Sequence, residues 1–314
     1  MDQRFAVEWL RDNVAAFGGD PNKMYLWGQS SGAASADFYN YAYPKDPIVK
    51  GFIMESGSVF ATGRFVDYSH SNFTFVAQHV GCGNMSAVNE LSCMRSVSWE
   101  SLINFYFTYN QEHSTGQLKF TTLPDNTTKF NDYEERALAG NFSRLPAILG
   151  NNQNEEASLI AWPGAQGPNM TEIWESTLST HLCTCNHAVD LRSNLSVSTF
   201  RYYNTANFSN ISPRPWEGAY HTSELPLIFG TYAEYNLDVA EPTALEHATS
   251  AYWQDLYLAF MRDPMNGLPS MGWPRYASNG SVMMMGGNGT ESVGSLIPAS
   301  YLERLCVGVE ESYD

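Results

Sequence analysis

The segment MYLWGQSSGAAS, residues 24–35, places two serines between two glycines. The strand-forming residues before this point and the small residues after it predict a buried strand, a tight turn and a helix. Gly28 and Gly32 flank Ser30 in the pattern G-x-S-x-G, which is typical of a serine held on a sharp strand-to-helix turn. We expect glycine at both positions because a Cβ there would collide with the neighbouring strand or helix. The alternative is a serine-rich loop without chemistry, since this composition produces about 0.2 chance matches per chain.

The composition limits the class of protein. The chain has 314 residues, of which 43% are hydrophobic and 16% charged, so it can bury a large core as one big domain or two small ones. Its net charge of -16 makes nucleic acid and anionic membrane surfaces poor partners. No apolar run approaches the roughly 18 residues of a transmembrane segment. We therefore expect neither a nucleic-acid partner nor a transmembrane segment.

Asparagine sequons indicate a secreted glycoprotein. Ten Asn-x-Ser/Thr sequons occur, at Asn72, Asn84, Asn126, Asn141, Asn169, Asn194, Asn207, Asn210, Asn279 and Asn288. Chance predicts about four, so the excess favours N-glycans and an extracellular location. Five cysteines agree with an oxidising compartment.

The first residues, MDQRFAVEWLRDNVAAFGG, do not form a signal peptide, because their charges leave no apolar central region. They predict an amphipathic helix with Ala6, Leu10, Val14 and Phe17 on one face and Gly18 as its stop. A core helix at the start of a secreted-looking chain indicates that a further segment precedes it.

These residues carry a family resemblance. The segment DQRFAVEWLRDNVAAFGGDPNKMYLWGQSSGAAS resembles the nucleophile region of type-B carboxylesterases, the carboxylesterase/lipase and cholinesterase family of the α/β-hydrolase fold, and its details look fungal. Further similar blocks follow in the family's order. They are GFIMESGS, VGCGNMSAVNELSCMRSVSWESL, LPAILGNNQNEEASL, GAYHTSELPLIFG and SAYWQDLYLAFMRDPMNGLPSMGWPRY.

The resemblance implies a Ser-Glu-His triad, in the chain order expected of this fold. Ser30 is the expected nucleophile, and the backbone N–H of Ser31 is an expected oxyanion donor. His221 in GAYHTSELP is the expected base, which a serine hydroxyl needs within hydrogen-bond reach. Glu155 aligns with the catalytic carboxylate, but Glu156 stands where the family usually has Gly, so the neighbour remains an alternative. Without the resemblance, two adjacent glutamates indicate only a solvated surface.

The resemblance also bears on the cysteines. It implies a disulfide between Cys82 and Cys93, whose short loop contributes about 3 kcal/mol in the chain-entropy model. Cys185 and Cys306 are a second expected pair by position, which leaves Cys183 free or exchanging with Cys185. The segment HLCTCNHA lacks a second ligand pair nearby, so we expect no metal site, and the family implies no cofactor.

The function follows from the resemblance with one rival. The only Gly-Gly pairs, Gly18-Gly19 and Gly286-Gly287, do not provide the upstream glycine loop of the oxyanion hole. The resemblance thus implies that residues 1–314 are the C-terminal two-thirds of a single α/β-hydrolase domain. We expect a carboxylic ester hydrolase that forms an acyl-serine intermediate on small-molecule or lipid esters. The alternative is a truncated, inactive pseudoenzyme or a cholinesterase-like binding glycoprotein.

The expected architecture is a mixed, mostly parallel sheet with helices on both faces. Its strands include residues 24–27, 51–54, 147–150 and 199–203, and no repeat or low-complexity linker divides the chain.

Overall fold

The computed structural model describes residues 1–61, 67–113, 115–160, 164, 167–236, 238–287 and 292–310. The chain divides into two compact units: a main unit of residues 1–63 and 130–314, and a small unit of residues 64–129. The single domain expected over residues 1–314 stays a prediction.

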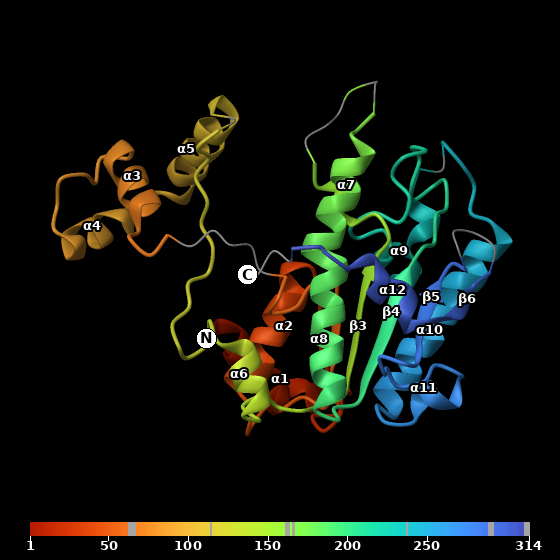
Figure 1. Ribbon diagram of the computed structural model, residues 1–314. Coiled ribbons are helices and arrows are strands. Elements are labelled where there is room, and N and C mark those ends of the chain that lie inside the picture. Colours follow the sequence, from red (N-terminus) through yellow and green to blue (C-terminus); the bar gives the residue numbers. More distant parts are fainter. Residues whose placement is uncertain are drawn as a thin grey trace. The chain divides into compact units, whose positions relative to one another are not determined.

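The main unit is built on a six-stranded sheet in the order β1-β2-β3-β4-β5-β6 (Figure 1). Its strands are β1 (Leu26–Gln29), β2 (Phe52–Glu55), β3 (Ala147–Asn152), β4 (Thr199–Asn204), β5 (Ser281–Met285) and β6 (Gly294–Pro298). The first five strands run parallel, and β6 pairs antiparallel to β5. The mixed, mostly parallel sheet is therefore confirmed.

Helices cover both faces of this sheet. One face carries α1 (Asp2–Asn13), α2 (Ser31–Ala42), α6 (Tyr133–Leu138), α8 (Cys183–Asn194) and α12 (Ala299–Leu305), and the other carries α9 (Leu225–Phe229), α10 (Ala244–Arg262) and α11 (Gly267–Ser270). Alternate strand residues enter the two cores, as Met54 and Leu149 do on the first face and Ile53 and Ile148 on the second. This period of two explains why residues on both sides of the central strands are buried.

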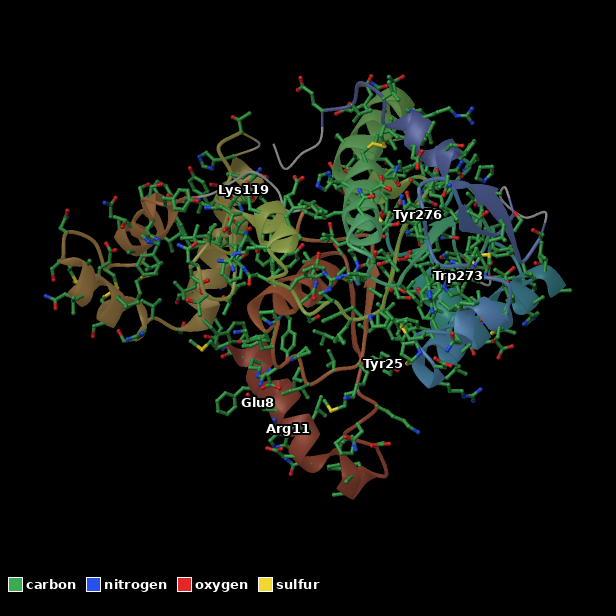
Figure 2. All side chains as sticks on the ribbon, turned by 60° about the horizontal axis from the view of Figure 1, so that its bottom comes forward. Glu8, Arg11, Tyr25, Lys119, Trp273 and Tyr276 are labelled. Carbon is green, nitrogen blue, oxygen red and sulfur yellow. A yellow bond between two sulfur atoms is a disulfide. The ribbon has the colours of Figure 1, made fainter. Side chains whose placement is uncertain are left out.

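Large aromatic side chains close the second core. Trp253 on α10 and Trp273 after α11 are fully buried, and the Phe200 ring of β4 lies edge-on to Trp273 at 6.2 Å between centroids. Figure 2 shows Trp273 beside this part of the sheet. These rings pack α10 and the segment after α11 against the sheet.

The expected strands are present, with shifted ends. The first strand begins at Leu26 rather than Met24 and runs on to Gln29, directly before Ser30. Strands β5 and β6 were not predicted. The run SVMMM of β5 is rich in unbranched methionine, which is a weak strand signal.

The amphipathic helix at the start of the chain exists, but its buried face differs from the prediction. Val7 is its only buried residue, whereas Leu10 and Phe17 are 44% and 79% exposed. Val14 and Phe17 lie in a 3-10 turn, which breaks the 3.6-residue period on which the prediction rests. Ala6 and Leu10 lie within the helix itself, whose buried side carries Val7 instead. Gly18 ends it in the left-handed conformation, as expected. Figure 2 shows Glu8 and Arg11 on this helix.

The described residues of the small unit form three helices around a core of their own. They are α3 (Ser71–His79), α4 (Ala87–Met94) and α5 (Trp99–Glu112). Its core includes Val76, Ala77, Met94 and Leu118. Cys82 and Cys93 form a disulfide that closes an 11-residue separation. A core this small gains much of its stability from such a cross-link.

The second disulfide corrects the expected pairing. Cys183, not Cys185, bonds Cys306, with 5.5 Å between the Cα atoms. Side chains two residues apart on a helix point to different sides of it. Only one of the two cysteines on α8 can therefore face α12. Cys185 is free and buried, and burial raises the pKa of its thiol.

None of the described helices has both the length and the apolar content of a membrane span.

Candidate active site

Ser30 occupies a strained turn between β1 and α2. Its backbone angles are φ 58 and ψ -124, a region that non-glycine residues rarely adopt. A Cβ on Gly28 would lie 2.2 Å from the carbonyl of Gly32, so glycine is required there. A Cβ on Gly32 would meet nothing within 4 Å, so the expectation of a collision at this second glycine is wrong.

Backbone contacts with the next strand fix the turn. The N–H of Ser30 donates to the carbonyl of Glu55, 2.7 Å away. A Cβ on Gly57 would lie 2.4 Å from the Ser30 carbonyl oxygen, so this glycine allows the close approach of the two turns. Ser31 is the first residue of α2, where helix N–H groups lack intrahelical partners and carry partial positive charge. The Ser31 N–H therefore has no partner within the helix, and its role as an oxyanion donor stays a prediction.

Glu155 lies just after β3, at the start of the 3-10 turn η2 (Glu155–Ser158), and is fully buried. Its Oε1 accepts hydrogen bonds from the Ser56 hydroxyl and the Asn152 backbone N–H, each at 2.6 Å. Its Oε2 lies 2.6 Å from Nδ1 of His221. The carboxylate is thus oriented by the ends of two strands toward the histidine.

The loop that carries Glu155 and the loop that carries His221 are joined by backbone hydrogen bonds. The His221 N–H donates to the Glu155 carbonyl at 3.2 Å, and the Asn154 N–H donates to the Ala219 carbonyl at 2.8 Å. The side chain of Asn152 donates to the Tyr220 carbonyl at 2.8 Å. His221 is 5% exposed, so these bonds hold a nearly buried ring in one orientation.

The tautomer of His221 follows from its two neighbours. Because the Glu155 carboxylate only accepts, Nδ1 carries the proton of the neutral ring. Nε2 is then an acceptor, and the Gln29 side-chain amide lies 3.3 Å from it. Since Gln29 directly precedes Ser30, this ring nitrogen, which the Gln29 amide contacts, lies close to the strained turn.

The structure thus brings Glu155 and His221 into direct contact, with the neighbour of Ser30 against the same ring. The alternative carboxylate, Glu156, instead lies 3.0 Å from Nε2 of His181. Sequence reasoning missed three groups beside Glu155 and His221: Ser56, Asn152 and His181. All three lie in segments quoted for other reasons, GFIMESGS, LPAILGNNQNEEASL and HLCTCNHA, and no local pattern shows that these segments meet.

Opposing effects set the charge of Glu155. Burial raises its pKa, but the positive charge of His181 and the hydrogen bond and charge of His221 outweigh burial, and the net pKa is lowered. Two further buried glutamates behave differently. Burial raises the pKa of Glu55 to about 7, and burial with the charges of Glu155 and Glu55 raises that of Glu224 well above its usual range. Of the three, Glu155 alone has a pKa below its usual range.

One cluster among the described residues has the spacing of a metal site. Ligand atoms of Glu155, His181 and His221 lie within 4.8 Å of one another. The Glu155 oxygens and Nδ1 of His221 already make the hydrogen bonds given above. The cluster is explained by hydrogen bonding, and we assign it no metal.

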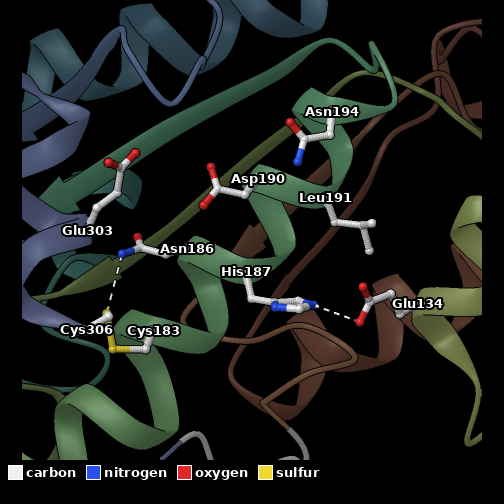
Figure 3. Close-up of a pocket in the computed structure, with 9 residues that line it drawn as sticks. All are labelled: Glu134, Cys183, Asn186, His187, Asp190, Leu191, Asn194, Glu303 and Cys306. Carbon is white, nitrogen blue, oxygen red and sulfur yellow. Dashed lines mark hydrogen bonds and ion pairs between the residues drawn. A yellow bond between two sulfur atoms is a disulfide. The ribbon is translucent and has the colours of Figure 1, made fainter. Parts of the chain in front are cut away.

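A hollow of about 310 Å³ lies elsewhere on the main unit, between α6, α8 and α12 (Figure 3). Asp190 and Glu303 line it together with the Cys183–Cys306 disulfide. Asp190 accepts a hydrogen bond from the Tyr276 hydroxyl at 2.7 Å. None of Ser30, Glu155 and His221 lines this hollow, so it is separate from the candidate active site.

The sheet, its flanking helices and the strand-to-helix turn at Ser30 define an α/β-hydrolase fold. A solved structure titled PNB esterase shares this fold with a TM-score of 0.74, over 97% of this chain and 67% of that one, at 19% identity. The chain belongs to the carboxylesterase family, whose model matches residues 1–183.

Two curated relatives are similar along most of this chain. Secreted lipase 5 of Gibberella zeae is 38% identical over 298 residues, which cover 88% of this chain and 54% of the relative. Chlorogenic acid esterase of Aspergillus niger is 41% identical over 269 residues, covering 85% of this chain and 51% of the relative. The chain thus spans about half the length of these relatives. The resemblance to fungal carboxylesterases and lipases is confirmed.

Proposed function

We propose that this protein hydrolyses carboxylic esters, with Ser30 as nucleophile, His221 as general base and Glu155 as the acid that orients it. The observation that carries the proposal is the 2.6 Å contact between Glu155 Oε2 and His221 Nδ1, which leaves Nε2 as an acceptor beside the turn at Ser30. A serine hydroxyl is a weak nucleophile until such a base removes its proton.

The proposed reaction has two halves. The Ser30 oxygen attacks the ester carbonyl while Nε2 of His221 takes the hydroxyl proton, and the oxyanion accepts a hydrogen bond from the Ser31 N–H. The ester C–O bond then breaks, and the imidazolium returns the proton to the departing alcohol. Water next attacks the acyl-serine through the same base, which releases the acid and restores Ser30. The Glu155 carboxylate stabilises the imidazolium in both halves.

The names of the relatives suggest the substrates. One relative is named a lipase and the other a chlorogenic acid esterase, so we take acylglycerols and hydroxycinnamate esters as the two candidate classes. The secreted relative, the two disulfides and the sequons support an extracellular, N-glycosylated protein.

The experiment compares hydrolysis of p-nitrophenyl esters of increasing acyl length, a triacylglycerol and chlorogenic acid. We expect turnover of at least one class, and a loss of at least about 10³-fold in the Ser30→Ala variant. Ser278→Ala, which changes an exposed serine, is the matched control and keeps the activity. A Ser30→Ala protein as fast as the parent would refute the assignment, and a folded parent that hydrolyses none of these esters would favour the inactive binding glycoprotein.

A further inference from the structure

A second histidine–carboxylate pair lies beside the proposed triad. Glu156 on η2 and His181 on the π-helical turn η4 (Leu178–Leu182) approach to 3.0 Å between Oε1 and Nε2. Their side chains are only 14% and 7% exposed. The pair is therefore largely withdrawn from water, where an ion pair is screened less than at a surface.

This pair is in contact with the site. The rings of His181 and His221 lie 5.2 Å apart between centroids. The titratable groups facing His181 in the described part of the chain are Glu155 and Glu156 from η2 and His221 from the loop before α9. Thr184, one turn further along the helix, donates its hydroxyl to the His181 carbonyl at 3.1 Å and so helps to fix that turn.

Two carboxylates of low exposure lie around the His181 ring. A carboxylate oxygen of Glu155 lies within 4.8 Å of a His181 nitrogen, and Glu156 Oε1 lies 3.0 Å from Nε2. A positive charge on the ring between them is favourable to both carboxylates. Burial lowers the pKa of His181, but the charge of Glu155 and the hydrogen bond and charge of Glu156 outweigh burial and raise it. The histidine thus favours its charged form beside the two glutamates.

The pair also bears on the charge of this loop. Glu156 directly follows Glu155, so the loop carries one more negative charge beside the triad acid than Glu155 alone would bring. The π-helical turn brings the compensating histidine to that position, and such turns often occur at functional sites.

We propose that His181 and Glu156 are positioning residues of the active site: His181 supplies the positive charge that balances the two adjacent glutamates, and Glu156 holds the His181 ring in place. This proposal rests on the proposed ester hydrolysis, in which an ionised Glu155 orients His221. With the positive charge of His181 nearby, Glu155 stays ionised at lower pH than it would without that charge. The two residues touch neither substrate nor the reacting atoms.

The first experiment needs no activity. We expect ¹³C NMR of the intact chain to show the Glu155 carboxyl titrating at higher pH in His181→Gln than in the parent, because the lost cation no longer favours the carboxylate. In Glu156→Gln, the His181 ring should titrate at lower pH, because it loses its partner. Unchanged titration of both groups would overturn the proposal.

The second experiment measures kcat/KM against pH. We expect His181→Gln to shift the acidic limb of the kcat/KM profile toward higher pH by about one unit. On that limb kcat/KM falls about tenfold, and at higher pH it changes little. The double variant His181→Gln/Glu156→Gln removes one charge of each sign and recovers most of the loss. A double variant as impaired as His181→Gln alone would contradict charge balance and indicate a packing role.

A matched control lies on the same helical segment. His187 pairs with Glu134 at 3.8 Å, with side chains 24% and 54% exposed, and is not part of the proposed machinery. His187→Gln leaves the Glu155 titration and the pH profile unchanged. If the parent hydrolyses no ester but its Glu155 carboxyl responds to His181→Gln, the ester-hydrolase assignment fails while charge balance beside Glu155 stands.

Discussion

Single residues hold the turn at Ser30. A backbone conformation of this kind costs on the order of 1–3 kcal/mol, so the surroundings must maintain it. They do so through the Ser30 N–H bond to Glu55 and the close approach of Gly57. The pattern G-x-S-x-G predicted the turn and the identity of Ser30 from local chemistry. It could not separate a glycine required by packing from one that is not, because that depends on atoms distant in the sequence.

The two glycines of the pattern make a matched pair of variants. Gly28→Ala places a methyl group 2.2 Å from the backbone of Gly32, so we expect a loss of several kcal/mol in the free energy of unfolding or an insoluble protein. Gly32→Ala meets nothing and lies in α2, where alanine favours the helix by up to about 1 kcal/mol. Urea denaturation measures both. Equal destabilisation by the two substitutions would contradict the described packing.

Glu55 gives the molecule a pH-dependent stability. Its pKa is raised to about 7 in the folded chain, against 4.5 for a free group, so the native state holds a proton that the unfolded state releases between these values. Stability from this group is complete below about pH 4.5 and is lost as the pH rises toward 7. The loss is up to about 3 kcal/mol.

Glu55→Gln removes this dependence while keeping an acceptor for the Tyr257 hydroxyl, which lies 2.7 Å from the Glu55 carboxyl. We expect the variant to match the parent near pH 5 and to exceed it in unfolding free energy at pH 8. Chemical denaturation at both pH values is the measurement. A variant less stable than the parent at pH 8 would show that the ionised carboxylate is well solvated or paired.

At the scale of elements, the sequence predicted those helices and strands whose signal lies in a short run of neighbouring residues. Strands β1 to β4 were found because each contains apolar and strand-forming residues bounded by breakers. The pair Cys82 and Cys93 was predicted through the resemblance, but the partner of Cys306 and the buried face of α1 were missed, because both depend on how helices rotate against the sheet. The contact between Glu155 and His221 came from the resemblance, since two loops 66 residues apart have no local signal for meeting.

The disulfide between α8 and α12 makes a testable contribution to stability. It closes a separation of 123 residues, for which the chain-entropy model gives about 5 kcal/mol. Cys306→Ser should therefore lower the unfolding free energy by several kcal/mol and leave Cys183 open to alkylation. Cys185→Ser should leave the cross-link intact, because Cys185 is not part of it. Peptide mapping that finds Cys185 bonded to Cys306 would restore the original expectation.

At the scale of the whole molecule, folding should decide which sequons carry sugar. Asn210 is 1% exposed, and its side-chain nitrogen donates to the Tyr232 carbonyl and the Glu246 carboxylate, each at 3.0 Å. A glycan there would break both bonds, whereas the nearby Asn207 is exposed. Glycopeptide mass spectrometry of the secreted protein should find Asn210 unmodified and Asn207 occupied. An Asn210 glycan in a folded protein would contradict the burial described for this residue.

The most direct test of the proposed triad is covalent labelling of the native chain with a fluorophosphonate, followed by mass spectrometry of its peptides. The account predicts one labelled residue, Ser30, because only a serine next to an oriented base reacts rapidly. The label should disappear in His221→Ala and persist in His187→Ala. Labelling at another serine, or labelling of Ser30 at the same rate without His221, would contradict the proposal that Ser30, His221 and Glu155 act together.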